Sequence, residues 1–325
     1  MNRFLAIAAA AVLAVTLASC GASNSGRQRL NLMLDFFPNA DHAGIYAAQA
    51  DGRFSAEKLD VAIHTPSDPS VPLKLLAAGK ADLAISYEPE VLRARDKGEP
   101  VVAVAALVRV PLTSIVSLPR AGIQTPADLR GKRVATAGID YQSAYLDAIL
   151  RRASVPRSSV RELNAGFDLV PALVSGRADA VLGAYWNYEA IQLRLQRRQP
   201  RVIRIEQAGV PTYDELVVTA TDDTVKHRAA LVRRFLRALA AGTSDLAQRS
   251  PQAVDALVRA NPDLDRRLQS ASIAVTRPYL EPPPGKPYGY LDPAAWSKFT
   301  AFMQSSGILS ARVQAGSAFT NQLLP

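Results

Sequence analysis

Polar side chains suited to ligand recognition gather directly after the first apolar run that follows the N-terminal region of this 325-residue chain. Leu30–Leu34 is the apolar run, and Asp35, Phe37, Asn39 and His42 follow it. In open α/β sheets, ligands bind beyond the carboxyl ends of strands and before helix N-termini. The stretch therefore predicts one wall of a small-molecule cleft. In the alternative interpretation, Asn39 is only a helix cap beside a bystander histidine.

A second polar and aromatic group, Tyr185-Trp186-Asn187-Tyr188-Glu189, follows the apolar run Ala180–Gly183. Tyrosine and tryptophan offer flat faces to an aromatic ring, and the Glu189 carboxylate accepts two N–H donors of a heterocycle. This group predicts the opposite wall of the cleft. The alternative for its aromatic residues is packing between two lobes.

Two further groups occupy similar positions. Tyr87 and Glu90 follow the strand-like Ala81–Ser86, although Glu90 alternatively only favours a helix N-terminus through the helix dipole. Tyr141 lies at the start of another predicted helix, where free N–H groups suit an anion or a polar tail. The residues that we expect to contact ligand are Asp35, Phe37, Asn39, His42, Tyr87, Glu90, Tyr141, Tyr185, Trp186, Asn187 and Glu189.

The sequence offers little for catalysis. Its three histidines, His42, His64 and His227, are scattered, and none has a metal-binding spacing to another ligand. The sequence has no Gly-x-Ser-x-Gly elbow, no phosphate-binding Gly-x-x-x-x-Gly-Lys-Ser/Thr and no Gly-x-Gly-x-x-Gly. We therefore expect no catalytic residue, no metal and no cofactor.

The N-terminus has the features of an exported lipoprotein. Arg3 precedes the apolar run Phe4–Leu17, which is too short to span a bilayer as a helix. Leu17-Ala18-Ser19-Cys20 resembles a lipobox, and Cys20 is the only cysteine, so an intramolecular disulfide is excluded. We expect a signal peptide over 1–19, lipidation of Cys20 and a flexible tether over 20–29. The alternative is an ordinary secretory peptide with an incidental cysteine.

A net charge of +9 raises the question of nucleic acid. The arginines between Arg151 and Arg204 are interleaved with apolar helix positions and not with stacking aromatic residues. This pattern is typical of a solvated basic face, which an anionic membrane surface also favours. We therefore expect no nucleic-acid partner.

Short apolar runs alternate with helical periods from Leu30 onward, which predicts an α/β fold with a mostly parallel sheet. Leu75–Leu83 and Leu173–Ala180 match in type, each a helix end, a glycine, a basic residue, Ala-Asp and a strand. This repetition supports two lobes built on one plan. We expect lobe 1 over 30–118 and 212–325, with the helical C-terminal tail packed on it, and lobe 2 over 119–211. Two chain crossings, near Pro119 and Pro211, would then form a hinge beside the cleft.

With these segments in view, the chain resembles the NMT1/THI5-like family. Its most specific segments are Leu34–Tyr46 and Gly183–Glu189, and Pro111–Ser114 and the Ala-Asp repeats also fit. The resemblance implies a type II periplasmic-binding-protein fold. It further implies the lipid-anchored, extracytoplasmic receptor of an ABC importer, a monomer that delivers an aminopyrimidine thiamine precursor to a permease and its ATPase. The precursor would be of the formyl-aminopyrimidine or hydroxymethylpyrimidine type.

The resemblance also raises two alternatives. Related binders take riboflavin precursors or other small heterocycles, and the acids and aromatics found here favour an amine-bearing aromatic ring. The superfamily also includes pyrimidine synthases that consume a lysine-bound pyridoxal phosphate and their own histidine. Ser86 and Glu90 stand at the positions of that lysine and histidine, and the cysteine-rich motif is missing. An enzyme is therefore disfavoured.

Overall fold

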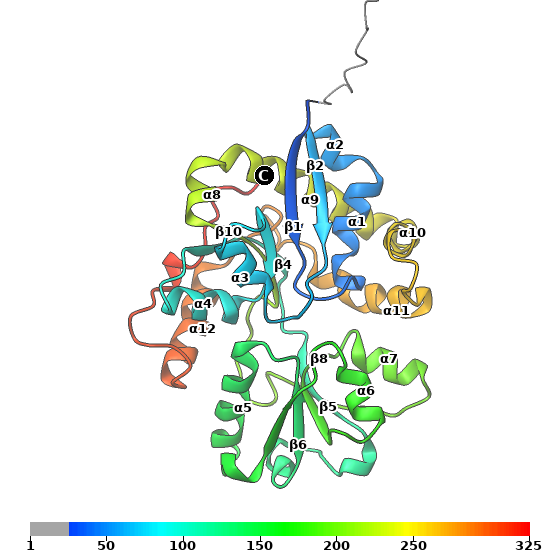
Figure 1. The fold of residues 1–325 in the computed structure, drawn as a ribbon, viewed down its shortest axis with the longest axis vertical. Helices are drawn as coiled ribbons and strands as arrows, with labels where there is room; N and C mark the ends of the chain where they lie inside the picture. The colour runs from blue at the N-terminus through cyan, green and yellow to red at the C-terminus, as the bar shows by residue number, and fades with distance from the viewer. Residues whose placement is uncertain (1–25) are drawn as a thin grey trace, which may run out of the picture.

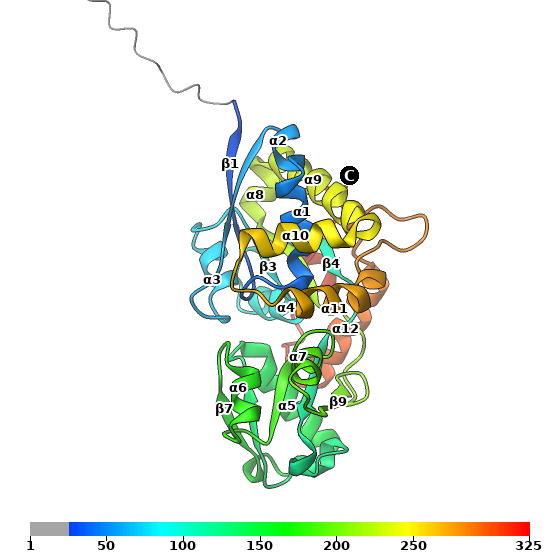
Figure 2. The ribbon, with the colours of Figure 1, turned by 90° about the vertical axis from the view of Figure 1, so that its right-hand side faces the viewer.

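The computed structural model describes residues 26–325, so the predicted signal peptide, the Cys20 lipidation site and most of the expected tether lie outside the described residues. The described chain forms two lobes, each built around one five-stranded sheet (Figures 1 and 2). Its first strand begins at Gln28, within the range expected to be tether. Gln28 and Arg29 are therefore part of lobe 1.

Lobe 1 has the strand order β2-β1-β3-β10-β4. Its strands are β1 (Gln28–Met33), β2 (Leu59–His64), β3 (Leu83–Ser86), β4 (Val101–Val108) and β10 (Leu216–Thr221). Its helices before the first crossing are η1 (Ala40–His42), α1 (Ala43–Ala50), α2 (Arg53–Ala56), α3 (Pro72–Ala77) and α4 (Glu88–Asp96). β1 pairs in parallel with β2 and β3, whereas β10 runs antiparallel to β3 and β4.

Lobe 2 has the strand order β7-β6-β8-β5-β9. Its strands are β5 (Thr113–Ser117), β6 (Arg133–Thr136), β7 (Arg161–Asn164), β8 (Ala180–Tyr185) and β9 (Arg201–Arg204). Its helices are η2 (Pro119–Ala121), η3 (Pro126–Leu129), α5 (Asp140–Arg152), η4 (Arg157–Ser159), α6 (Leu169–Val174) and α7 (Glu189–Leu195). β6 is parallel to β7 and β8, and β5 is antiparallel to β8 and β9.

Four of the five strands in each sheet run in the same direction, as expected for a mostly parallel sheet. The exceptions are β5 and β10, the strands that follow each crossing, which are antiparallel to both neighbours. One expectation needs correction. The first lobe boundary lies earlier than 118, because β5 belongs to the second sheet and the chain crosses between Val108 and Thr113. The second crossing falls between Arg204 and Leu216, a range that includes the expected boundary at 211–212.

The helical tail packs on lobe 1, as Figure 1 shows. It comprises α8 (Asp222–His227), α9 (Ala229–Gln248), α10 (Ser250–Ala260), α11 (Arg266–Thr276), η5 (Arg277–Tyr279), α12 (Pro293–Ser305) and η6 (Ala315–Ser317). α9 and α10 pack against α1, and the segment after α12 reaches β4, where Ala103 bonds to Ala318 and Thr320. α11 also contacts α7 of lobe 2, directly below it in Figure 2.

The repeated Gly-basic-Ala-Asp segment has the same structure in both lobes. Gly79 and Gly176 take positive φ angles of 69° and 75° and end α3 and α6, a conformation that glycine adopts at little cost. The following Asp82 and Asp179 each accept a backbone N–H of the neighbouring parallel strand, from Asn31 at 2.7 Å and Arg133 at 2.8 Å. In each lobe this aspartate therefore fixes the register between its own strand and the neighbouring parallel strand.

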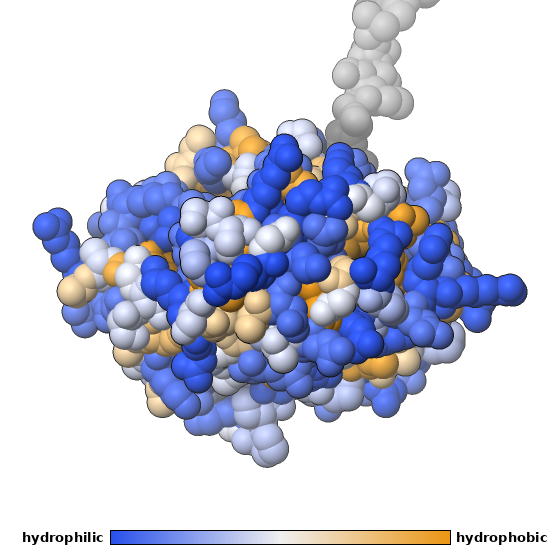
Figure 3. All heavy atoms as spheres, turned by 90° about the horizontal axis from the view of Figure 1, so that it is seen from below, coloured by the Kyte–Doolittle hydropathy of each residue, from blue (hydrophilic) through white to orange (hydrophobic). Residues whose placement is uncertain are grey.

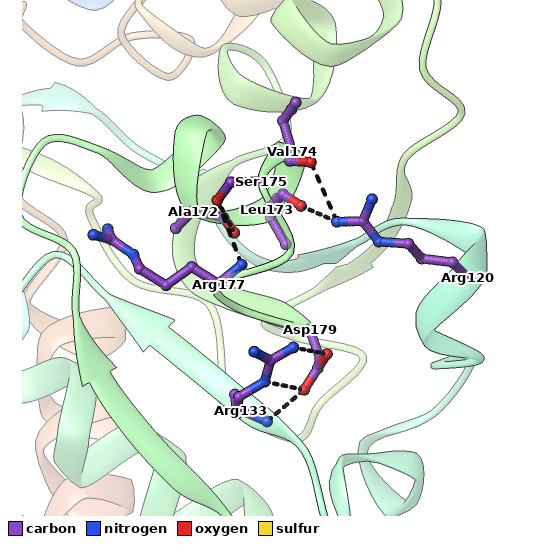
Figure 4. Close-up of polar contacts among 8 residues, drawn as sticks. All are labelled: Arg120, Arg133, Ala172, Leu173, Val174, Ser175, Arg177 and Asp179. Carbon is purple, nitrogen blue, oxygen red and sulfur yellow. Dashed lines mark hydrogen bonds and ion pairs between the residues drawn. The ribbon is translucent and has the colours of Figure 1, made fainter.

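Figure 4 shows this junction in lobe 2. The Arg133 guanidinium pairs with both oxygens of Asp179, at 3.0 and 2.7 Å. Arg120 donates to the carbonyl of Leu173 at the end of α6. The last carbonyl groups of α6 have no partner within the helix, and an arginine from the β5–β6 connection supplies their hydrogen bonds.

The two crossing segments are joined through one buried carboxylate, that of Glu215. One of its oxygens accepts the backbone N–H groups of Leu112 at 2.6 Å and Thr113 at 2.8 Å, and the Tyr213 hydroxyl at 3.1 Å. The other oxygen accepts the Thr113 hydroxyl at 2.9 Å. Leu112 and Thr113 belong to the first crossing, and Tyr213 and Glu215 to the second. These residues form the hinge clamp.

The outer surface of the molecule is mainly polar. Seen from below, hydrophilic residues dominate and apolar residues are scattered among them (Figure 3). The arginines expected to form a solvated face are all exposed, namely Arg151, Arg152, Arg157, Arg161, Arg194, Arg197, Arg198, Arg201 and Arg204. Within residues 26–325, no helix has both the length and the apolar character needed to cross a membrane.

Close packing of α1 on α9 depends on glycine. A Cβ atom at Gly242 would lie 2.4 Å from the Gly44 carbonyl oxygen and 2.7 Å from the Ala48 backbone nitrogen, neither of which can move independently. We expect Gly242→Ala to lower the free energy of unfolding by about 1–3 kcal/mol, the usual cost of overpacking. Urea unfolding measures the effect. Gly316→Ala, where a Cβ meets no atom within 4 Å, is the matched control and should be near neutral; equal stability of the two variants would contradict the packing argument.

The hinge clamp should make stability depend on pH. Burial, opposed by the N–H groups of Thr113 and Leu112, raises the pKa of Glu215 from 4.5 to about 7. Between these values the folded protein holds more protons than the unfolded chain, so stability falls as pH rises through this window, by at most about 1.4 kcal/mol per pH unit for one proton.

Glu215→Gln removes this titration and should reduce the slope between pH 4.5 and 7 by up to the contribution of one proton, measured by urea unfolding. The exposed Glu206→Gln is the control and should keep the slope of the unchanged protein. A Glu215→Gln slope equal to that of the unchanged protein would show that the carboxylate titrates normally.

Candidate functional site

A cavity lies between the lobes, at the carboxyl ends of β1, β3, β6 and β8. Lobe 1 contributes the end of β1 and the start of α4, and lobe 2 contributes the segments after β6 and β8. The lining residues are Asp35, Phe36, Asn39, Tyr87, Ala137, Ile139, Tyr141, Gln142, Leu169, Gly183, Tyr185, Tyr188 and Glu189. Both predicted walls therefore meet at one cavity.

Asp35 is held in place from two sides. Its Oδ1 lies 2.8 Å from Nε2 of His42, and its Oδ2 accepts the Tyr87 hydroxyl at 2.8 Å. Nδ1 of His42 accepts the backbone N–H of Asn39 at 3.2 Å, so the ring proton lies on Nε2 and is donated to Asp35. His42 is fully buried behind Asp35 and does not line the cavity. It orients a carboxylate that does.

Asn39 caps the short helix η1 and also lines the cavity. Its Oδ1 accepts the Asp41 backbone N–H at 2.9 Å, and its Nδ2 donates to the Phe37 carbonyl at 3.1 Å. With the bond from its N–H to His42, these contacts form a capping box. Asn39 therefore both caps a helix and lines the cavity, two roles that the sequence presented as alternatives.

Glu189 is placed by a β-bulge in β8. Ser114 pairs with Ala184 and Ile115 with Leu182, so Gly183 is the extra residue. Its φ of +106° suits glycine, and a Cβ there would lie 2.4 Å from Gln142 Nε2. After the bulge, Oε2 of Glu189 accepts the Tyr185 backbone N–H at 2.7 Å. Burial, opposed by this hydrogen bond, raises the pKa of Glu189 to about 7.

Aromatic rings form much of the cavity wall. Tyr87 of lobe 1 and Tyr141 of lobe 2 contact across the cleft with ring centroids 5.4 Å apart. Phe36 packs against Phe167 of lobe 2 at 4.7 Å. The Tyr141 hydroxyl is fully buried and has no hydrogen-bond partner within the described chain. It is a polar group available to a ligand in an otherwise aromatic wall.

Six of the eleven residues expected to contact ligand line this cavity. They are Asp35, Asn39, Tyr87, Tyr141, Tyr185 and Glu189. The other five lie outside it, for reasons of local geometry. Phe37 packs 6.0 Å from Tyr188 and from Phe167, behind the wall that Phe36 presents. His42 lies behind Asp35.

Trp186 points away from the cavity because Tyr185, the residue before it, points in. Its Nε1 donates to the Pro111 carbonyl at 3.0 Å, and the Arg204 guanidinium lies 4.2 Å from its ring centroid. Its ring also contacts Tyr279 of lobe 1 at 5.8 Å. Trp186 therefore has the interlobe packing role that the sequence left open.

Asn187 and Glu90 are also engaged elsewhere. Asn187 is fully buried and bonds to Asp41 and Thr276 of lobe 1. Glu90 accepts the Ser86 hydroxyl at 2.6 Å and faces a neighbouring crevice that Lys74 and Arg93 also line. α7 begins only at Glu189, and the turn between β8 and α7 directs Asn187 toward lobe 1.

Seven lining residues were not among the expected contacts. Tyr188 and Gly183 belong to the segment Gly183–Glu189, and Gln142 directly follows the expected Tyr141. The aromatic ring of Tyr188 and the amide of Gln142 were usable signals. Phe36 is adjacent to two expected residues, and only the direction of its side chain was missing. Ala137, Ile139 and Leu169 are ordinary apolar residues with no sequence signal.

The cavity has an acidic and aromatic character. Within the part of the chain that the structure describes, its lining residues include Asp35 and Glu189 but no lysine, arginine or histidine. Across residues 26–325, no three His, Cys, Asp or Glu side chains are grouped so as to hold a metal ion. The arrangement can stack a flat ring and accept N–H donors from it.

Comparison with solved structures shows the fold. The alkanesulfonate-binding protein SsuA of Xanthomonas axonopodis pv. citri superimposes with a TM-score of 0.69 over 90% of this chain and 98% of that protein, at 16% sequence identity. The predicted two-lobe fold of periplasmic binding proteins is thereby confirmed.

Comparison of sequences shows the family. The chain is 35% identical over 284 residues to a thiamine biosynthesis protein of Haemophilus influenzae, covering 87% of this chain and 88% of the relative. It is 33% identical over 313 residues to the formylaminopyrimidine-binding protein of Halalkalibacterium halodurans, covering 94% of each. Residues 39–253 match the family described as NMT1/THI5 like. The chain belongs to the NMT1/THI5-like family.

Proposed function

We propose that this protein is the extracytoplasmic solute receptor of an ABC importer and that it binds an aminopyrimidine thiamine precursor of the formyl-aminopyrimidine or hydroxymethylpyrimidine type. The lobes close on the ligand, and the closed receptor delivers it to a permease and its ATPase. The similarity to a formylaminopyrimidine-binding protein over 94% of the chain supports the ligand class.

One observation carries the proposal: the interlobe cavity combines aromatic walls with the Glu189 carboxylate and no basic side chain among its described lining residues. Only Oε2 of Glu189 is bonded within the described chain, to the Tyr185 N–H, which leaves Oε1 for an N–H of the ligand. An anionic ligand such as a sulfonate or a phosphate would instead meet two carboxylates without a counter-charge. An amine-bearing ring fits this environment.

The cavity walls approach each other closely, because the ring centroids of Tyr87 and Tyr141 lie 5.4 Å apart across the cleft. A single flat ring needs less separation of these walls than a fused ring system of the riboflavin type. In our proposal Tyr87, Tyr141 and Tyr185 contact the ring and Asn39 its polar substituents.

Lipid anchoring belongs to the same proposal. The lipobox-like Leu17-Ala18-Ser19-Cys20 supports removal of residues 1–19 and acylation of Cys20. The lipid would hold a monomeric receptor at the outer face of the cell membrane. Intact mass of protein purified from its native membrane would test the modification.

A pyrimidine synthase is the second candidate, favoured by membership of a family that includes such enzymes. A lysine-bound pyridoxal phosphate needs an amine at the position of Ser86. Here the Ser86 hydroxyl donates to Glu90 at the end of β3, and neither residue lines the cavity. The residues present therefore do not fit the cofactor, and we propose that the protein binds without turnover.

Glu189→Gln tests the receptor function. The variant retains an acceptor for the Tyr185 N–H but replaces the free carboxylate oxygen by an amide group. Loss of a charge-assisted hydrogen bond of about 1.5–3 kcal/mol weakens binding roughly 10- to 150-fold. Titration calorimetry with formyl-aminopyrimidine and with hydroxymethylpyrimidine gives the affinities.

The exposed Glu206→Gln is the matched control and should bind like the unchanged protein. Riboflavin is the comparison ligand, and tighter binding of riboflavin than of either pyrimidine would overturn the ligand assignment. An affinity unchanged in Glu189→Gln would remove this carboxylate from the binding site.

The enzyme alternative has a direct test. After incubation with pyridoxal phosphate and iron(II) under air, the intact mass of the protein should be unchanged and no pyrimidine should form. A mass loss localised to a lysine or a histidine would mean that the protein consumes its own side chains, contrary to our proposal.

A further inference from the structure

We propose that Asn187 of lobe 2, together with Asp41 and Thr276 of lobe 1, forms an interlobe latch that stabilises the closed cleft and thereby sets ligand affinity from outside the cavity. The proposal rests on the proposed function only where it concerns the ligand. Closure itself is a property of the chain and can be measured without one.

The latch uses both N–H donors of the Asn187 amide. Nδ2 of Asn187 donates to Oδ1 of Asp41 at 2.8 Å and to Oγ1 of Thr276 at 2.7 Å. The Thr276 hydroxyl donates to the Ser272 carbonyl at 2.8 Å, so its lone pair is directed to the amide. All three latch side chains are buried, with at most 2% exposure.

A neighbouring contact joins the same two surfaces. Nε2 of Gln269 donates to the Tyr188 hydroxyl at 3.0 Å, and both groups are buried. Gln269 and Thr276 lie on α11, two turns apart on one face. The turn at Asn187 and Tyr188 therefore docks on α11 and η1 through side chains that belong to different lobes.

The latch acts on binding without touching the ligand. None of its three residues lines the cavity, so a bound ligand leaves these hydrogen bonds intact. Opening the lobes separates the partners, because Asn187 lies in lobe 2 and both acceptors lie in lobe 1. The apparent Kd of a receptor equals its intrinsic Kd divided by the fraction of closed molecules. Loss of the latch therefore weakens binding through that fraction.

A proton on Asp41 would complete the latch. Two buried oxygens of the latch, Asp41 Oδ2 and Asn187 Oδ1, have no hydrogen-bond partner within the described chain. Both atoms only accept while Asp41 is ionised, whereas a protonated Asp41 offers a donor. Buried acceptors without a donor are costly, so the closed state favours the neutral acid.

The surroundings of Asp41 agree with this charge state. The titratable groups near Asp41 are Asp35 and His42 from lobe 1 and Glu189 from lobe 2. α10 packs against η1, and the buried face of α10 is apolar. Burial raises the pKa of Asp41 to about 7, with His42 and Asn187 opposing and Asp35 adding to the effect. Opening restores water and an ordinary pKa, so the closed state gains protons, and its advantage is lost as pH rises through about 7.

Small-angle X-ray scattering of the ligand-free protein tests the latch at pH 6 and pH 8. The radius of gyration of the unchanged protein should be smaller at pH 6. Asp41→Asn places an amide donor where the acid carries its proton, so this variant should be compact at both pH values. Asn187→Ala should be expanded at both, and the more conservative Thr276→Val should shift in the same direction.

Titration calorimetry with formyl-aminopyrimidine at pH 6 provides the second measurement. Asn187→Ala should weaken binding about tenfold, whereas Asp41→Asn and the control Glu206→Gln should not. If no heterocycle binds to any variant, the proposed function fails while scattering still decides the latch. Equal radii for Asn187→Ala and the unchanged protein at pH 6 would overturn the latch. A radius of the unchanged protein that does not depend on pH would overturn the role of the proton.

Discussion

The molecule depends on one buried carboxylate where the chain passes between its lobes. The first crossing begins the antiparallel strand β5 and the second begins β10, and Glu215 accepts donors from both segments. One carboxylate with four donors holds the two crossings, which run in opposite directions between the lobes, close together. The lobes can then move relative to each other only by bending around this point, which preserves the alignment of the two cavity walls.

The cavity region places several acids out of water, and each is stabilised differently. Asp35 is bonded to His42 and Tyr87, Glu189 to a backbone N–H, and Asp41 to an amide from the opposite lobe. Buried carboxylates without counter-charges are costly. A cleft of this kind is therefore most stable when a ligand or a second lobe supplies hydrogen-bond donors, and that requirement links recognition to closure.

The sequence predicted element types well, because hydrophobic period and glycine stops are local signals. The glycines of the repeated segment follow the ends of α3 and α6, and both predicted walls line the cavity. The sequence could not assign β5 to a sheet, because the apolar residues of this strand fit the core of either lobe. The pairing of β5 depends on strands that are distant in the sequence. The direction of Trp186 and Asn187 was not predictable either, because the bulge at Gly183 and the turn before Glu189 determine which side chain enters the cavity.

The two tryptophans of the chain differ in a way that gives the protein an internal optical reporter. Trp296 is fully buried and packs against Phe319 of the C-terminal tail, so its ring stays out of water when the lobes separate. Trp186 belongs to lobe 2, yet its ring contacts Tyr279 of lobe 1. Separation of the lobes would remove this contact and hydrate only one indole. The intrinsic fluorescence of Trp296 should therefore stay constant while that of Trp186 changes. The ratio of the two emission intensities then reports the opening of the cleft in solution without an attached dye.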